Sequence, residues 1–351
     1  MEEKIKMEIL YLVGEPLFKP EESRQEFVTP FGQTDLCQRV LSETQNPQTV
    51  LNHLREEYLA IVGSLKVMGI DFRIVYSHPK EVDKTLIMAC IEHFGCKLAG
   101  FDNKYSLQAI IYPRDFATVL PGVVLVNSAA VGIKVSHKED YRIMRSPYGL
   151  GGRALVCGKI MLISERITLE DGRLLSPQGL EEIRRMGIRI GLLPLPACTT
   201  ISMDSGVSNI NNRFSCNDHL DRVACLIQGK DGALHLVVDP QIHSVNWKGL
   251  CSPKETLERI RSACEPLGII VHCPKKLEVP YSLNLVQFPD GRVLMTSGDE
   301  AVAEVIIEVV GKDKAFGTPI PIRFLPVWAY AGIRCLTNGL PKTLFIPKAS
   351  A

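Results

Sequence analysis

The side chains best suited to covalent chemistry in this chain are a thiol and an imidazole that lie far apart in the sequence. Cys335 belongs to the segment Gly332-Ile333-Arg334-Cys335-Leu336-Thr337-Asn338, sixteen residues before the C-terminal residue. His219 begins the segment His219-Leu220-Asp221. A cysteine thiolate is a strong nucleophile, and a histidine can deliver and remove the protons that such a reaction moves. Together these residue types indicate covalent catalysis at a cationic carbon.

Charged residues adjoin both groups. Arg334 directly precedes Cys335, and a neighbouring positive charge favours the thiolate over the thiol. Asp221 lies two residues after His219, and residues two apart on an extended strand share one face. The Asp221 carboxylate can therefore orient the imidazole, stabilise its charge, or accept hydrogen bonds from the N–H groups of a substrate.

Two further residues are candidates for substrate binding. Asp115 ends the segment Tyr112-Pro113-Arg114-Asp115, and a carboxylate holds a planar guanidinium through paired, charge-assisted hydrogen bonds. The alternative for Asp115 is a turn residue or a surface ion pair. Arg213 lies in a polar segment before His219 and is the preferred candidate to bind a substrate carboxylate, whereas most other arginines near the motifs are expected to be solvated.

The spacing of apolar residues predicts the helices that position these groups. Four stretches place apolar residues on one helical face and end immediately before a glycine, which supplies a left-handed C-terminal cap. They cover residues 52–68, 176–186, 252–267 and 299–310, and a less regular fifth helix is predicted over 81–94.

Short strands and hairpins alternate with these helices. Strands are predicted at 70–76, 188–193 and 269–272, and hairpins over 106–126, 154–163, 226–238 and 285–295. The unit of hairpin, helix and strand recurs every ~60–70 residues, so about five units fit the chain. We expect a single α/β domain over residues 1–351, a closed array such as a propeller in which residues 7–13 pair with the C-terminal segment, rather than an ordinary α/β sheet. Residues 197–217 are expected to form a polar loop.

The composition excludes several classes of function. The 351 residues are 46% hydrophobic and 23% charged with a net charge of +1, so neither a nucleic acid nor a membrane is expected as a partner. No apolar run comes near the length of about 18 residues that a membrane-spanning helix needs. The charged N-terminus lacks the apolar core of a signal peptide, and both observations favour a cytoplasmic protein. The eleven cysteines include no Cys-x-x-Cys pair, so neither disulfides nor a metal site is expected. Whether the chain forms a homo-oligomer stays open.

Four of these segments resemble, in the same order, the motifs of the guanidino-group-modifying enzymes. This family comprises arginine deiminases, agmatine deiminases, dimethylarginine hydrolases and amidinotransferases. The segments are residues 112–115, 151–159, 219–221 and 332–338, and the resemblance extends over roughly 52–340. Its most specific parts are the His-x-Asp and the Gly-x-x-Cys-Leu-Thr-Asn near the C-terminus.

The resemblance implies a fold and a set of roles. The family's fold is a five-bladed α/β propeller with a central active site. By position, Cys335 would be the nucleophile, His219 the general acid/base, and Asp115 and Asp221 the carboxylates that hold the substrate. No cofactor is implied, and the substrate would be a small guanidino or amidine compound.

One position departs from the family pattern. In the hydrolases of this family the double glycine is usually bracketed as Glu-Gly-Gly-Asp, whereas this chain has Leu150-Gly151-Gly152-Arg153. Leucine cannot bind a guanidinium, and a buried guanidinium needs its charge and its donors satisfied. Three explanations compete: another carboxylate substitutes, the substrate carries a less basic amidine-like or ureido-like group, or catalysis has been lost. The candidate substitutes are Asp140, Asp204 and Asp218.

The resulting hypothesis is an arginine deiminase-like hydrolase that cleaves a C–N bond of a guanidino or amidine compound through a covalent thiouronium adduct on Cys335. Two alternatives stay open. With an amine in place of water as acceptor, the reaction would be an amidinotransfer. Without catalysis, the chain would be a binding protein on the same fold.

Overall fold

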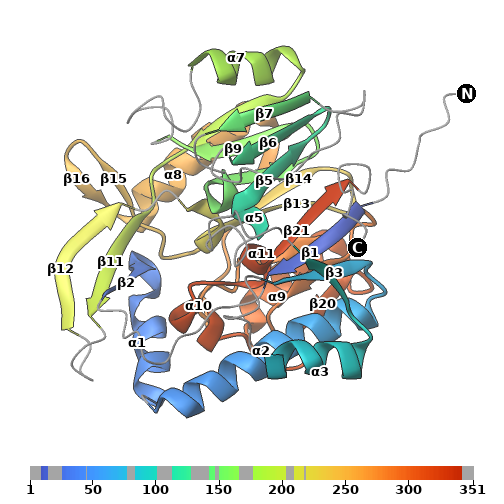
Figure 1. Ribbon diagram of the computed structural model, residues 1–351. Helices are drawn as coiled ribbons and strands as arrows, with labels where there is room; N and C mark the ends of the chain where they lie inside the picture. The colour runs from blue at the N-terminus through green and yellow to red at the C-terminus, as the bar shows by residue number, and fades with distance from the viewer. Residues whose placement is uncertain are drawn as a thin grey trace, which may run out of the picture.

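Three-stranded sheets with the same pairing pattern recur along the chain (Figure 1). The computed structural model describes residues 9–14, 26–44, 46–76, 84–100, 113–127, 142–146, 150–165, 177–202, 209–216 and 219–341. In each repeat an antiparallel pair of strands is followed by a third strand that lies parallel to the second. Four repeats consist of β5 (Ala117–Leu120), β6 (Val123–Asn127) and β7 (Arg142–Ser146); β8 (Ala154–Cys157), β9 (Ile160–Ser164) and β10 (Arg189–Leu193); β13 (Ala224–Gln228), β14 (Leu234–Val238) and β17 (Ile269–His272); and β18 (Val286–Gln287), β19 (Val293–Met295) and β20 (Ala315–Gly317).

A fifth sheet joins the two ends of the chain. The C-terminal strand β21 (Thr337–Pro341) pairs antiparallel with β1 (Ile9–Gly14), which pairs parallel with β3 (Phe72–Tyr76). β4 (Lys97–Gly100) extends this sheet. The expected pairing of the N-terminal strand with the C-terminal segment is therefore confirmed. Every sheet of the described residues is open, so strand pairing alone does not make a ring.

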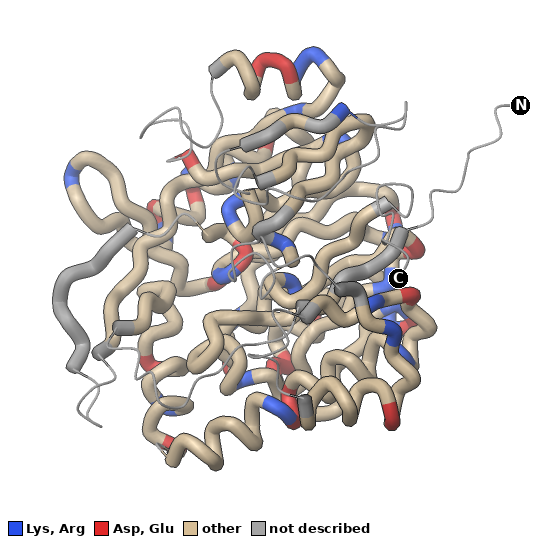
Figure 2. Tube along the Cα trace, viewed as in Figure 1, with Lys and Arg blue, Asp and Glu red and all other residues tan. Residues whose placement is uncertain are grey.

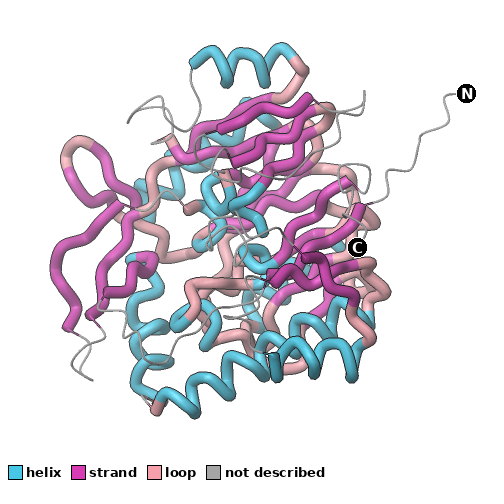
Figure 3. Tube along the Cα trace, in the orientation of Figure 1, coloured by secondary structure: helices cyan, strands magenta, loops and turns pink. Residues whose placement is uncertain are grey.

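Helices connect the second and third strands of several repeats and lie outside the sheets. They are α7 (Pro177–Arg185), α8 (Pro253–Cys264) and α9 (Glu300–Val310), with α2 (Pro47–Val67) between β1 and β3. Figures 1 and 3 show α2 and α3 (Lys84–Phe94) along one side of the molecule and α7 on the opposite side, with strands between them. The mixed α/β architecture predicted from the sequence is thus observed. None of the described helices has the length and apolarity that crossing a membrane would require.

The boundaries of α2 differ from the prediction because its N-terminus is set by polar capping rather than by apolar spacing. The helix begins at Pro47, not at residue 52. The side chain of Asn46 accepts hydrogen bonds from the backbone N–H groups of Gln48 (3.0 Å) and Thr49 (3.1 Å). Gly69, with φ +66°, follows its C-terminal end as expected. A further helix, α1 (Thr34–Glu43), was not predicted.

The expectation of a polar loop over residues 197–217 was wrong. β11 (Ala197–Ser202) and β12 (Asn209–Cys216) form an antiparallel pair, and β11 also pairs with β2 (Glu26–Pro30). The partner β2 lies about 170 positions earlier in the chain, and local composition carries no information about so distant a pairing. A second short hairpin, β15 (Ser244–Asn246) and β16 (Gly249–Cys251), lies beside this sheet in Figure 1.

A buried carboxylate connects α2 to the short helix α10 (Phe324–Trp328). Glu57 is 3% exposed, and its carboxyl oxygens accept hydrogen bonds from the backbone N–H groups of Arg323 (2.7 Å), Phe324 (2.8 Å) and Leu325 (2.8 Å). Burial raises the pKa of Glu57 to about 7, and a carboxyl group offers acceptor oxygens in either protonation state. These bonds satisfy the first donors of α10.

We expect Glu57→Ala to lower the free energy of unfolding by about 3 kcal/mol, because two buried and one part-buried backbone donor lose their acceptor. Urea titration followed by circular dichroism measures this difference. Glu56→Ala is the matched control, since the Glu56 side chain is 66% exposed on the same helix and should contribute little. Equal effects of the two substitutions would contradict the capping role of Glu57.

Candidate active site

The four motif segments singled out by the sequence occupy the same place in four of the repeated sheets, immediately before a strand. Helix α5 (Pro113–Phe116), which contains Asp115, precedes β5, and the short helix η2 (Gly151–Arg153) precedes β8. The short helix η3 (Leu220–Arg222), which contains Asp221, precedes β13, and α11 (Ile333–Leu336), which contains Cys335, precedes β21. η2 packs against η3, and α5 packs against both η2 and α11. Figure 1 shows α5 and α11 close together near the centre of the molecule.

The thiol and one predicted carboxylate face each other. Cys335 Sγ lies 3.6 Å from Asp221 Oδ2, with Cys335 half-buried and Asp221 fully buried. The Arg334 guanidinium donates to the same carboxylate oxygen from Nη1 (3.0 Å) and to the carbonyl oxygen of Ala154 from Nη2 (2.7 Å). One oxygen of Asp221 therefore contacts both the thiol and a buried cation.

His219 and the second oxygen of Asp221 converge on Gly152. A Cβ atom at Gly152 would lie 2.4 Å from Asp221 Oδ1 and 2.6 Å from His219 Nδ1. Only glycine leaves room for both side chains, which explains the second residue of the double-glycine motif. Asp221 Oδ1 is buried and accepts no hydrogen bond from the described residues. It can accept an N–H donor of a bound molecule.

Asp221 is held ionised by its surroundings. Burial alone would raise the pKa of this carboxyl group, but the Arg334 guanidinium, together with His219, Arg222 and Arg114, lowers the pKa below its ordinary value. Arg222 is itself anchored, since Nη1 donates to the carbonyl oxygen of Val28 (3.2 Å). Figure 2 shows that basic and acidic residues lie near one another at the centre of the molecule.

The structure adds a functional candidate that sequence analysis missed. Asn284, 1% exposed, donates from Nδ2 to Cys335 Sγ (3.3 Å) and to the carbonyl oxygen of Asp221 (2.9 Å), and its Oδ1 accepts from the Cys335 backbone N–H (3.1 Å). It lies two residues before β18, the place that the other site residues take in their repeats. That position, at the start of the predicted hairpin 285–295, was the signal that could have found it.

The remaining predicted site residues are placed only by their backbone. Asp115 lies in α5, and the buried Asn338 side chain fixes this helix by donating to the carbonyl oxygens of Pro113 (2.8 Å) and Ala117 (3.0 Å). Arg213 lies on β12, the outer strand of its sheet, which is at the left edge of Figure 1, whereas α11 is near the centre. The side chains of Asp115 and Arg213 are outside the described part of the structure, so both roles stay predictions.

Leu150, which stands where the family has glutamate, belongs to the hydrophobic core. It is fully buried and packs in a cluster with Leu120, Val123, Met161 and Ile163, which come from β5, β6 and β9. Its side chain therefore serves packing and supplies no polar group to the site. The three suggested substitutes, at positions 140, 204 and 218, lie outside the described residues.

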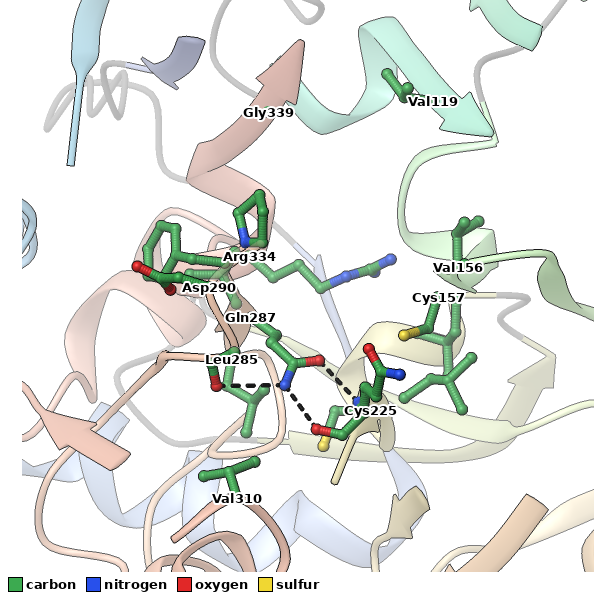
Figure 4. A pocket seen from close by; sticks show the side chains of 18 of the residues that line it. Val119, Val156, Cys157, Cys225, Leu285, Gln287, Asp290, Val310, Arg334 and Gly339 are labelled. Atoms are coloured by element: carbon green, nitrogen blue, oxygen red, sulfur yellow. Dashed lines mark hydrogen bonds between the residues drawn. The ribbon is translucent and has the colours of Figure 1, made fainter. Parts of the chain in front are cut away.

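A cavity of about 630 Å³ adjoins the site, and Arg334 belongs to both. Its walls include one residue from each of β5, β8, β13, β18 and β21, namely Thr118, Leu155, Cys225, Val286 and Gly339. Figure 4 shows the Arg334 side chain extending across this space from the wall that carries Gly339 toward the wall that carries Val156. Through its bond to Asp221, Arg334 connects the cavity with the surroundings of Cys335.

Most other described thiols are kept protonated by burial. Burial raises the pKa of Cys37 and Cys225 to about 12, and that of Cys157 and Cys264 to about 11. The ten described cysteines are all free thiols. Within the described ranges, no group of three or more His, Cys, Asp and Glu side chains is arranged to hold a metal ion.

Solved structures that resemble this one include agmatine deiminases. The agmatine deiminase of C. jejuni aligns over 96% of this chain and 98% of its own, with a TM-score of 0.53 and 15% sequence identity. A cysteine-to-serine variant of that enzyme with substrate bound aligns over the same shares, with a TM-score of 0.52 and 15% identity. The agmatine deiminase of Enterococcus faecalis aligns over 95% of this chain and 92% of its own, with a TM-score of 0.51 and 14% identity.

These likenesses confirm the resemblance at the level of the fold: the chain has the fold of guanidino-group-modifying enzymes. No family model matches the sequence, and no curated protein sequence matches it.

Proposed function

We propose that the chain hydrolyses a C–N bond of a small guanidino or amidine compound, with Cys335 as the nucleophile. The observation that carries this proposal is that Asp221 contacts the Cys335 thiol through Oδ2, while its Oδ1 and His219 Nδ1 converge on Gly152. The shared fold with agmatine deiminases supports it, as does the cysteine-to-serine variant that was solved with substrate bound. Thiol, imidazole and carboxylate are the groups that a two-step covalent hydrolysis needs.

In the first step the Cys335 thiolate attacks the central carbon, so that an S–C bond forms. The C–N bond to the leaving amine breaks, and His219 supplies the proton that the amine takes with it. The product is an S-amidino adduct. In the second step water attacks the same carbon, His219 accepts a proton from it, and the sulfur leaves as a thiolate.

The carboxylates would hold the substrate during both steps. Asp221 Oδ1, which accepts no hydrogen bond from the described residues, accepts one substrate N–H, while Oδ2 stays engaged with Arg334. Asp115, in the helix that packs against α11, would supply a second acceptor. Arg213 would bind a substrate carboxylate. Because Leu150 lies in the core, its position supplies no carboxylate to bind a strongly basic guanidinium.

The five sheets would form the blades of one five-bladed propeller that comprises the whole chain. Their shared order of strands supports this arrangement, and so does the cavity, to which each of β5, β8, β13, β18 and β21 contributes a wall. The site residues then lie at one end of these strands, around the central axis. In such an array, segments far apart in sequence meet without long loops.

A non-catalytic binding protein on the same fold is the second candidate. Two observations favour it: Leu150 packs in the core, and Arg334 occupies one oxygen of Asp221 that a substrate could otherwise use. The site would then bind a small ligand without turning it over. The following experiment separates the two functions.

The test measures ammonia or amine release from a panel of guanidino, amidine and ureido compounds. We expect at least one compound to be turned over, and the rate to fall by roughly three orders of magnitude or more in Cys335→Ser. Cys273→Ser is the matched control, because Cys273 is a half-buried thiol whose pKa burial raises, and its loss should leave the rate unchanged. Turnover that survives Cys335→Ser would contradict the mechanism, and no turnover of any compound would favour the binding protein.

A further inference from the structure

We propose that Asn284 is a positioning residue for the nucleophile: its side-chain amide holds the Cys335 sulfur in place and stabilises the thiolate by donating a hydrogen bond to it. The inference rests on the proposed function, since it concerns the same thiol. The sulfur lies 3.3 Å from Asn284 Nδ2. A hydrogen bond from a neutral N–H to an ionised acceptor is stronger than one to the neutral form.

The orientation of the Asn284 side-chain amide is fixed by three contacts, and a fourth anchors its backbone. Nδ2 donates to Cys335 Sγ and to the carbonyl oxygen of Asp221 (2.9 Å), while Oδ1 accepts from the Cys335 backbone N–H (3.1 Å). The Asn284 carbonyl oxygen accepts in turn from the backbone N–H of Arg334 (3.1 Å). A flipped amide would set a donor against the Cys335 N–H and an acceptor against the Asp221 carbonyl, so this network permits one orientation only.

The surrounding backbone is shaped to admit this side chain. Asn284 follows a tight turn in which its own N–H bonds to the carbonyl oxygen of Tyr281 (2.8 Å), and Tyr281 has a positive φ of 56°. On the other side, a Cβ atom at Gly332 would lie 2.4 Å from Asn284 Oδ1. The positive φ of Tyr281 and the glycine at position 332 are backbone constraints, and a side chain that only filled space would not need them.

The neighbours of the Cys335 sulfur have opposite effects on its protonation state. The Asn284 amide is a neutral hydrogen-bond donor among them. Asp221 Oδ2, 3.6 Å away, accepts from the thiol and therefore favours its protonated form. The amide N–H favours the thiolate instead. Among the described side chains, the other charged or titratable groups on the elements that pack here include Arg334 on the same helix, Arg222 and His219 at η3, Arg114 on α5, Arg153 on η2, and Tyr281 in the turn before β18.

The test follows alkylation of Cys335 by iodoacetamide as a function of pH in wild type and in Asn284→Asp. The variant keeps the size of the side chain but replaces the donor with a negative oxygen beside the sulfur. We expect the rate constant at pH 7 to fall about tenfold or more, and the pH of half-maximal rate to move upward. Asn284→Ala, which adds no charge, should move both in the same direction by less, and it serves if the acidic variant does not fold.

Asn338→Asp is the matched control. Asn338 is also a buried asparagine, three residues from Cys335, but its amide bonds to Pro113 and Ala117 and not to the sulfur. It should lower stability and leave the pH profile of alkylation in place. If Cys335 is alkylated rapidly in wild type and its pH profile of alkylation is the same in both Asn284 variants, the positioning role alone is overturned. A wild-type Cys335 of ordinary reactivity would overturn the proposed function, and this role with it.

Discussion

Gly152→Ala is expected to reduce turnover by about 100-fold or more, because the added methyl group occupies the space in which the His219 and Asp221 side chains meet. Its Cβ would lie 2.4 Å from Asp221 Oδ1 and 2.6 Å from His219 Nδ1, so both side chains must leave their present positions. Steady-state kinetics on the compound with the highest turnover measures the loss. Circular dichroism establishes that the variant is folded.

Gly317→Ala is the control for this substitution. Gly317 ends β20, and a Cβ atom there would have its nearest contact, with Ser297, at 3.6 Å, an ordinary packing distance. Turnover and stability should both stay near the wild-type values. If Gly152→Ala retained wild-type turnover, the convergence of His219 and Asp221 on this point would have no part in the reaction.

Arg334→Met is expected to lower the free energy of unfolding by about 3–5 kcal/mol, because it leaves the carboxylate of Asp221 buried without its closest cation. Asp221 is fully buried and Arg334 is nearly so, and the pair is joined at 3.0 Å. Urea titration at pH 7 measures the change. The ion pair of Arg259 with Glu165 is the matched control: its side chains are 34% and 29% exposed, so Arg259→Met should cost only about 1 kcal/mol.

The pH dependence of this loss has a definite sign. In wild type the pKa of Asp221 lies below its ordinary value. The charged carboxylate therefore stabilises the fold at pH values above the ordinary pKa, and this contribution is lost as the pH falls through the folded-state pKa. In Arg334→Met the closest cation is gone, so burial raises the pKa of Asp221 and makes its charged form unfavourable in the folded state. The difference between wild type and variant should therefore shrink as the pH falls toward about 4.

A double variant isolates the cause. Adding Asp221→Asn to Arg334→Met removes the unpaired charge and should recover a large part of the lost stability. If the double variant is as unstable as the sum of the two single variants, the loss is due to packing around Arg334 rather than to the buried carboxylate.

Local signals in the sequence predicted much of the fold, and the motifs singled out Cys335 and Asp221, which the fold brings together. Apolar spacing with glycine caps located α2, α7, α8 and α9, and Asp-Gly turns located the hairpins β13–β14 and β18–β19. These signals are local, so they can be recognised without knowledge of tertiary contacts. The repeat of hairpin, helix and strand explains why residues more than a hundred positions apart, such as Asp221 and Cys335, meet at one point.

What the sequence could not predict depends on partners distant in the chain. β11 forms because β2 lies beside it, and nothing in a polar stretch indicates that partner. Asn284 carries no motif of its own, and its role arises from its distance to Cys335 in the folded chain. Leu150 was recognised as a departure from the family pattern, but its place in a core cluster follows only from the packing of β5, β6 and β9.

The pairing of Arg334 with Asp221 bears on the kind of substrate that the proposed site accepts. The described cations around the sulfur include Arg334 and Arg222, and the described carboxylate that touches it is Asp221. Among the described carboxylate oxygens near the sulfur, Asp221 Oδ1 is the free acceptor, and it suits a single N–H better than the paired donors of a guanidinium. We therefore expect ureido-like or weakly basic amidine compounds to rank above strongly basic guanidines in the turnover panel, and a reversed order would contradict this expectation.

The most direct measurement of the central claim is peptide mapping of all eleven cysteines after brief exposure to iodoacetamide near pH 7. Cys335 is half-buried and receives a hydrogen bond at its sulfur, whereas burial keeps thiols such as Cys37 and Cys225 protonated. The account predicts that Cys335 is labelled first, ahead of every other cysteine by about tenfold or more. Slow and uniform labelling of the cysteines, or faster labelling at another position, would contradict it.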